Sequence, residues 1–119
     1  MKYEVVARRS KEEVESAISI NDPGEVLYAV LSAALYSEDR EWAEGICLLL
    51  SNHEHFNVRG NAILGLGHIA RIHGHLNEFK AKPVIQAALR DENEYVRRHA
   101  NDAADDVESF LNWKVERPV

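Results

Sequence analysis

The chain lacks most of what specialised classes of protein depend on. Among its 119 residues is a single cysteine, Cys47, so no disulfide can form within the chain. No apolar run approaches the roughly 20 residues that a membrane-spanning helix needs. Residues 1–6 contain none of the long apolar stretch of a signal peptide. These absences predict a protein of a reducing compartment with no membrane association, and we expect the cytoplasm.

Positive charge is also in short supply. Fourteen Lys and Arg residues face 20 Asp and Glu residues, which gives a formal net charge of −6 at pH 7. Affinity for nucleic acid comes largely from clustered Lys and Arg, so no nucleic-acid partner is expected. An acidic chain instead favours a basic partner.

Sequence patterns of catalysis and metal binding are missing as well. The chain has no glycine-rich phosphate loop after a strand, no serine in a nucleophile elbow and no His-Glu-x-x-His pattern. The histidine pairs 53/55 and 73/75 flank one expected helix, whose length separates them by roughly 25 Å. We therefore expect no catalytic residue, metal or cofactor. The alternative is a metal or weak enzymatic site built from His53, Glu54 and His55.

What the chain does have is an internal repeat. The segment Val58-Arg59-Gly60-Asn61-Ala62 returns 38 residues later as Val96-Arg97-Arg98-His99-Ala100. Each copy follows a polar loop and a short apolar helix. A repeat of this period indicates a stacked helical array, because a single unit cannot bury its apolar face alone.

Capping signals set the limits of the expected helices. Ser10 and Glu13 have the spacing of a capping box. Asp22 with Pro23 predicts a second helix start, and Glu25 is expected to complete a second capping box there. The predicted helices are 11–20, 23–36, 41–50, 57–73, one that ends at Arg90, and 94–112. No strand is expected. The whole chain, 1–119, is predicted to be one domain of three helical pairs, about 10–36, 40–73 and 78–112, with 114–119 as a loose tail.

The segment from Leu89 to Ala100 and the one from Leu50 to Ala62 resemble HEAT repeats. The first pair departs from the pattern at Leu27, where the repeat usually has arginine, but end repeats are often atypical. The resemblance implies an α-α superhelix, a short solenoid of about three HEAT-like pairs, and a non-enzymatic protein-binding role.

In size, charge and fold the chain also resembles the small immunity proteins of bacterial toxin–immunity systems. That resemblance implies a protein that binds and neutralises a cognate toxin. Its partner would be a basic toxin domain, and it would be a monomer when free. The alternative is an adaptor or scaffold subunit of a larger complex.

In HEAT-like stacks the second helix of each pair lines the inner face, which is where we expect the partner to bind. Helical geometry predicts that Val58, Ala62, Leu66, Ile69 and Ile72 are buried on one side of their helix. On the last helix it buries Val96, Ala100, Ala103, Val107 and Phe110. The predicted partner-binding residues are Tyr28, Ser32, Leu35, Tyr36, Gly60, Leu64, Gly67, Arg71, Arg98, Asp102, Asp105 and Asp106.

Several of these residues have two interpretations. Gly60 and Gly67 either relieve crowding between neighbouring helices or let a partner backbone approach. The carboxylates from Asp102 to Glu108 either attract a basic partner or form a solvated helix face.

Other residues are expected to have structural roles, and one alternative face stays open. Arg59 and Arg97 are expected to bind the preceding loop, for example through Asp91 for Arg97. Cys47 is expected to be a buried small hydrophobe. The outer face, with Trp42 and Glu44, is the alternative interface.

Overall fold

Helices make up most of the chain. A computed structural model of the protein describes residues 6–118. The helices in this part are α1 (Lys11–Ile20), α2 (Pro23–Tyr36), α3 (Arg40–Leu50), α4 (Phe56–His73), α5 (Glu78–Ala88) and α6 (Glu94–Leu111). No strand occurs between residues 6 and 118, so the prediction of an all-α chain is confirmed. No helix in this range is both long and apolar enough to span a bilayer.

The first helix starts were predictable because their caps are local. The hydroxyl of Ser10 accepts a hydrogen bond from the Glu13 backbone N–H, and the Glu13 carboxylate accepts one from the Ser10 backbone, which completes a capping box. Asp22 caps α2 by accepting from the Glu25 backbone N–H. The second capping box is incomplete, since the Glu25 carboxylate lies 3.4 Å from the guanidinium of Arg9 instead.

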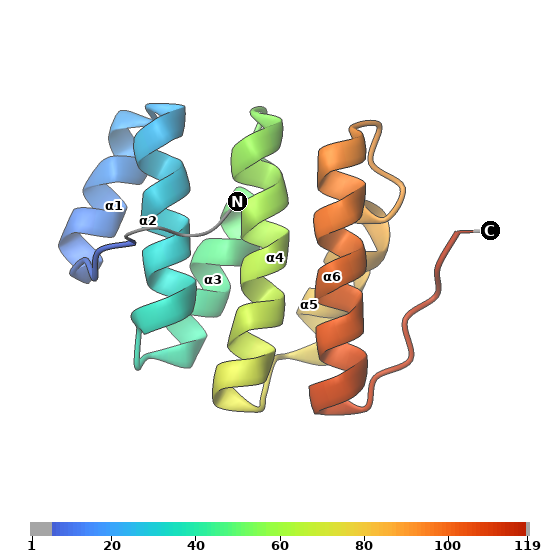
Figure 1. Cartoon of the computed structure of the whole chain (residues 1–119). Coiled ribbons are helices and arrows are strands. Elements are labelled where there is room, and N and C mark those ends of the chain that lie inside the picture. The colour runs from blue at the N-terminus through green and yellow to red at the C-terminus, as the bar shows by residue number, and fades with distance from the viewer. Residues whose placement is uncertain (1–5, 119) are drawn as a thin grey trace.

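The helices form three pairs that stack in two layers (Figure 1). Helices α2, α4 and α6 lie side by side in one layer, α3 and α5 lie behind them, and α1 packs against α2 at the left end of the stack in this view. Helix α4 is central and contacts both α2 and α6. This arrangement is compatible with the predicted short solenoid.

The core lies between the two layers and runs through all three pairs. The positions predicted to be buried on α4 and α6 are confirmed for Val58, Ala62, Leu66, Ile69, Val96, Ala100, Ala103 and Val107. The prediction is wrong for Ile72 and Phe110, which are 44% and 49% exposed. Both lie in the last turn of their helix, where less of the neighbouring helices is available to cover a side chain. Cys47 is fully buried as expected, and burial raises the pKa of its thiol to about 12.

Two equivalent arginines hold the loops before α4 and α6. Arg59 donates to the carbonyl oxygens of His53 and Glu54, and Arg97 donates to those of Asp91 and Glu92. The predicted loop contact of Arg97 is thus made to the backbone of Asp91. The Asp91 carboxylate instead accepts two hydrogen bonds from Arg59, one from Nε at 2.8 Å and one from Nη2 at 3.0 Å. This bidentate pair joins the second helical pair to the third.

The end of the described chain departs from the predicted loose tail. Val115 is buried, and the backbone N–H of Glu116 donates to the side chain of Gln86. Arg117 donates to the carboxylates of Asp105, at 2.8 Å, and Glu108, at 2.7 Å. The segment has no regular secondary structure, yet these contacts fix it along α5 and α6.

Candidate functional site

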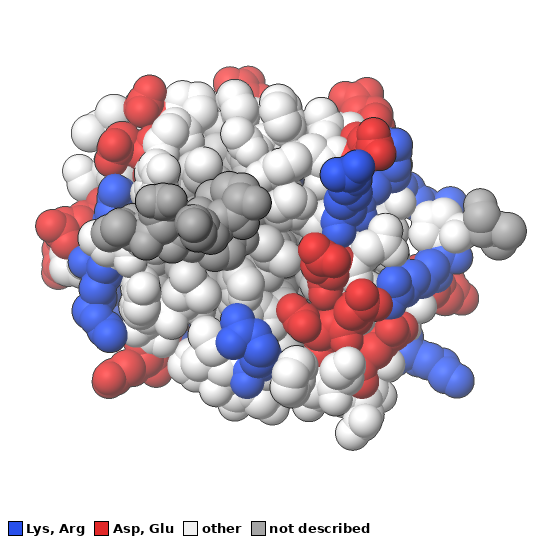
Figure 2. Space-filling model, viewed as in Figure 1, with Lys and Arg blue, Asp and Glu red and all other residues white. Residues whose placement is uncertain are grey.

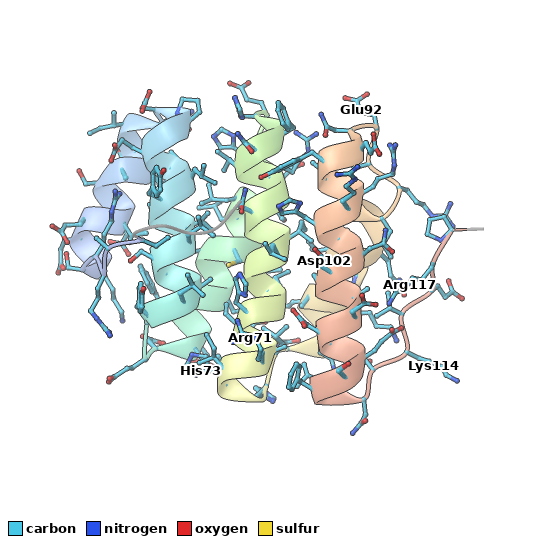
Figure 3. The ribbon with its side chains drawn as sticks, in the orientation of Figure 1. Arg71, His73, Glu92, Asp102, Lys114 and Arg117 are labelled. Atoms are coloured by element: carbon cyan, nitrogen blue, oxygen red, sulfur yellow. The ribbon has the colours of Figure 1, made fainter. Side chains whose placement is uncertain are left out.

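The predicted partner-binding residues all lie on α2, α4 and α6, the layer that faces the viewer in Figure 1. Figure 2 shows acidic side chains gathered on this face over α6. Figure 3 places Asp102 of α6 and Arg71 of α4 on the same side of the molecule. The structure therefore brings the α4 and α6 residues of the set together, but not all of them are accessible.

The part of the face formed by α2 is partly covered by the chain itself. Ser32, predicted to be exposed, is 1% exposed, because its hydroxyl accepts a hydrogen bond from the backbone N–H of Arg9 at 2.9 Å. The guanidinium of Arg8 lies over the ring of Tyr36 at 5.0 Å. Tyr28 is 46% exposed, and Leu35 is half-buried. Tyr28 is thus the most accessible apolar side chain among the predicted residues of α2.

The glycines of α4 pack against α6, so their predicted exposure is wrong. A Cβ atom on Gly60 would lie 3.0 Å from the ring of Tyr95. On Gly67 it would lie 2.7 Å from the Asp106 carboxylate and 3.1 Å from the Cα of Ala103. Both glycines are buried. The helices approach closely here because these positions carry no side chain, which corresponds to the crowding interpretation.

Leu64, between the two glycines, is also buried, because α4 has a neighbouring helix on each side. The helical-wheel prediction treated α4 as covered on one side only. Gly60, Leu64 and Gly67, all predicted to lie on the accessible inner face, are therefore in the interior of the stack.

The acidic residues of α6 fall into two groups. Asp105 forms an ion pair with Arg117. Asp102 is exposed and Asp106 is half-buried, and neither has an ion-pair partner between residues 6 and 118 within 4 Å. Burial raises the pKa of the Asp106 carboxyl; nearby Arg71 opposes the shift, and the charges of Asp102 and Asp105 add to it.

The two predicted basic residues of the site differ in their surroundings. Arg71 is exposed and donates to Nδ1 of His68 at 2.9 Å. Arg98 is exposed and lies 3.5 Å from Glu94, one turn earlier on α6. Only Arg71 is close enough to the acidic residues to affect the pKa of Asp106.

Sequence analysis missed a set of stacked rings on this face. His55 stacks on Phe56, the edge of Phe56 meets Tyr95, and Tyr95 packs against His99, with ring centres 5.2, 5.4 and 4.1 Å apart. We call these four residues the aromatic ladder. Phe56 is 39% exposed, while the others are half-buried. The helical spacing from Tyr95 to His99 and Asp102 is the signal that could have revealed part of it.

The histidine alternative gains no support from the positions of its residues. The Nε2 of His53 lies 2.8 Å from the side-chain oxygen of Asn21, and its Nδ1 accepts from the backbone N–H of His55. The Nδ1 of His55 caps α4. Across residues 6–118, no three His, Cys, Asp or Glu side chains are grouped so that they could hold a metal.

The outer-face residues singled out in the sequence have internal contacts. Glu44 is buried, pairs with Arg40 and accepts from the backbone N–H of Asn77. Trp42 is half-buried and donates from Nε1 to Glu15 at 3.0 Å. The described structure thus uses both residues to connect neighbouring helices.

Comparison with known proteins gives one informative similarity. No protein-family model matches the chain. No curated protein matches it either. Among solved structures, it is similar to a chain in the crystal structure of a CDI complex from Cupriavidus taiwanensis. The TM-score is 0.79 at 27% sequence identity, and the similarity covers 92% of this chain and 97% of that chain.

Proposed function

We propose that this protein is an immunity protein that binds a cognate bacterial toxin and neutralises it, without being an enzyme. The observation that carries the proposal is the similarity to a chain of a CDI (contact-dependent inhibition) complex, which extends over nearly the full length of both chains. A similarity of this extent concerns the whole stack rather than one helical pair. It therefore supports a shared mode of action more strongly than a shared repeat would.

Charge supports the immunity role. The chain has a net charge of −6, and two carboxylates of its α6 face, those of Asp102 and Asp106, have no ion-pair partner among residues 6–118. A surface of this kind attracts a basic protein and raises the rate of association. The toxin would then be blocked at its active site or in its access to substrate, in the cytoplasm of the cell that makes both proteins.

In this proposal the toxin binds to the layer formed by α2, α4 and α6. Only the accessible residues of that layer contact it. Tyr28, Phe56 and Tyr95 supply aromatic surface, and Asp102 and Asp106 supply charge. Aromatic anchors beside a charged rim are typical of the energetic centre of protein interfaces. The HEAT-like character of the repeats is part of the proposal, since arrays of this kind present an extended binding surface.

The test is co-expression with the polypeptide encoded beside the gene of this chain. We expect that neighbour to stop growth when it is expressed alone, and growth to resume when this chain is present. Replacement of both Asp102 and Asp106 by Asn keeps the side-chain shape and should weaken protection, whereas the double replacement Glu12→Gln and Glu13→Gln removes the same charge on α1 and should not. Recovery of this chain in a large assembly, with no effect on a toxic neighbour, would support the adaptor alternative and contradict the proposal.

A further inference from the structure

One face of α6 carries a continuous stripe of aromatic and acidic side chains. Tyr95, His99, Asp102 and Asp106 follow one another at intervals of four, three and four residues, which places them on a single side of the helix. We call these four residues the α6 stripe. Its chemistry changes along the helix from aromatic rings to carboxylates, and Figure 3 shows Asp102 on the side that faces the viewer.

The aromatic end of the stripe is fixed in position. The ring of Tyr95 packs over Gly60, and its hydroxyl accepts a hydrogen bond from the buried Asn61 side chain at 2.8 Å. The Nδ1 of His99 lies 3.0 Å from the carbonyl oxygen of Tyr95 and must donate to it, because a carbonyl only accepts. The two rings therefore keep their orientation without a ligand.

The acidic end of the stripe is positioned as well. Because Gly67 has no side chain, the carboxylate of Asp106 can lie against α4. Asp102 is exposed one turn away. Other aspartates of the chain have internal partners: Asp91 pairs with Arg59, Asp105 with Arg117, and Asp39 with Lys11. In the α6 stripe, carboxylates without an ion pair in the described structure thus follow aromatic rings along one side of a helix.

Charges from neighbouring elements limit where a ligand can lie. Arg71 of α4 lies near Asp106, and Arg98 points from α6 itself toward Glu94. The positive charge of Arg71 would repel a cation from Asp106. Asp102, which lies between Asp106 and the rings along α6, is therefore the favoured carboxylate for a cation. A cation bound there would lie beside His99 and Tyr95.

We propose that the α6 stripe binds an arginine side chain of the protein partner, with the guanidinium against the packed pair of His99 and Tyr95 rings and paired with Asp102. This inference rests on the proposed function for the identity of the partner. The planar guanidinium stacks on aromatic rings and donates two parallel hydrogen bonds to a carboxylate. Lysine has a compact, strongly hydrated ammonium that does neither as well, so the stripe selects arginine.

A peptide titration tests the stripe without the partner. The probes are acetyl-Gly-Arg-Gly-Arg-Gly-amide and the same peptide with lysine in place of arginine, added to the full chain while backbone amide signals are followed by NMR. We expect the shift changes to centre on Tyr95, His99 and Asp102, with the arginine peptide binding about threefold more tightly. Changes that spread evenly over acidic surfaces, or that centre on Glu12 and Glu13 of α1, would overturn the inference.

A matched pair of variants extends the test to the protein partner. Asp102→Asn is expected to weaken binding of the co-expressed toxin by about tenfold, while Glu12→Gln, an equal charge change on α1, leaves it unchanged. If the unaltered chain binds the toxin and Asp102→Asn binds equally well, the inference fails while the proposed function stands. If the unaltered chain binds no toxin, the proposed function fails, and the peptide titration still decides whether the stripe selects arginine.

Discussion

Gly45 and Gly67 both lie inside helices, but only Gly67 faces another helix. An alanine Cβ at Gly67 would meet the Asp106 carboxylate at 2.7 Å and the Ala103 Cα at 3.1 Å, whereas one at Gly45 meets nothing within 4 Å. The carboxylate can move, but the backbone of α6 cannot. We predict that Gly67→Ala lowers the free energy of unfolding by about 1 to 3 kcal/mol.

The same substitution at Gly45 is the control, and it should raise the free energy of unfolding instead of lowering it. Alanine is a better helix former than glycine, so Gly45→Ala should stabilise the chain by about 0.5 to 1 kcal/mol. Urea unfolding of both variants measures the difference. Equal destabilisation by the two changes would contradict close packing of α4 against α6.

His68 makes stability depend on pH. Burial, with smaller effects of Arg71 and His99, lowers its pKa to about 4. The pKa of this imidazole in the unfolded chain is near 6.5. At a pH between about 4 and 6.5, the unfolded chain therefore binds a proton that the folded chain does not. The free energy of unfolding should therefore fall as the pH drops through this window, by up to about 3 kcal/mol. His68→Gln should remove most of this loss, while His75→Gln, at an exposed position, should keep it in thermal melts from pH 7 to 4.5.

The burial of individual residues could be predicted where one helix face decided it. Val58 and Val96 are buried as their spacing indicates. Ser32 and Gly60 were wrongly predicted to be exposed. The residues that bury them, Arg9 and Tyr95, are far away in the sequence. A helical wheel contains no information on such neighbours.

At the scale of elements, the second and third helical pairs are joined by the ion pair of Arg59 with Asp91. Both side chains are 16% exposed, and Arg59 makes two hydrogen bonds to the carboxylate and two to the loop backbone. Lysine keeps the charge but loses this geometry. We predict that Arg59→Lys lowers the free energy of unfolding by about 2 kcal/mol.

The exposed pair of Arg98 with Glu94 provides the control for that prediction. Its side chains are 76% and 70% exposed, so Arg98→Lys should change stability by less than about 0.5 kcal/mol. Thermal and denaturant unfolding of both variants gives the comparison. If the two substitutions had the same small effect, Arg59 would not be a structural link between the pairs.

Arg117 holds the C-terminal segment against α6. Its side chain donates to Asn101, Asp105 and Glu108. Without these bonds, the described residues 114–118 would keep the backbone contacts of Val115 and Glu116 and the buried side chain of Val115. We predict that Arg117→Gln weakens the attachment by about 1 kcal/mol. Amide exchange at Val115 and Glu116 should become several-fold faster, with no change in α4. Lys114→Gln removes a charge from the same segment and should leave the exchange unchanged.

Helix starts with local caps were predictable from sequence, whereas the end of α5 at Ala88 instead of Arg90 and the attachment of the end of the chain were not. Ser10 caps α1 through Glu13, three residues away, so the signal is contained in a few residues. Arg117 binds carboxylates on a preceding helix, and nothing in its immediate surroundings indicates that contact. Local chemistry sets the elements, and long-range packing sets how irregular segments lie on them.

At the scale of the whole molecule, the repeat correctly indicated stacked pairs and an all-α chain. The site was harder to predict, because accessibility depends on how three helices share one layer. Asp102 and Arg71 do lie on a common exposed face (Figure 3), but Leu64 and Gly60 are inside the stack. Ring contacts such as that of Phe56 with Tyr95 require residues from two helices and so were not visible in one repeat.

Binding to a toxin is the central claim, and the most direct measurement is the state of the mixed proteins in solution. The chain and the polypeptide encoded beside its gene would be purified separately, mixed in equal amounts and analysed by size-exclusion chromatography with light scattering. We predict a one-to-one complex that weakens as salt rises, since opposite charges contribute to association. A toxic neighbour that elutes separately from this chain at every salt concentration would contradict the account.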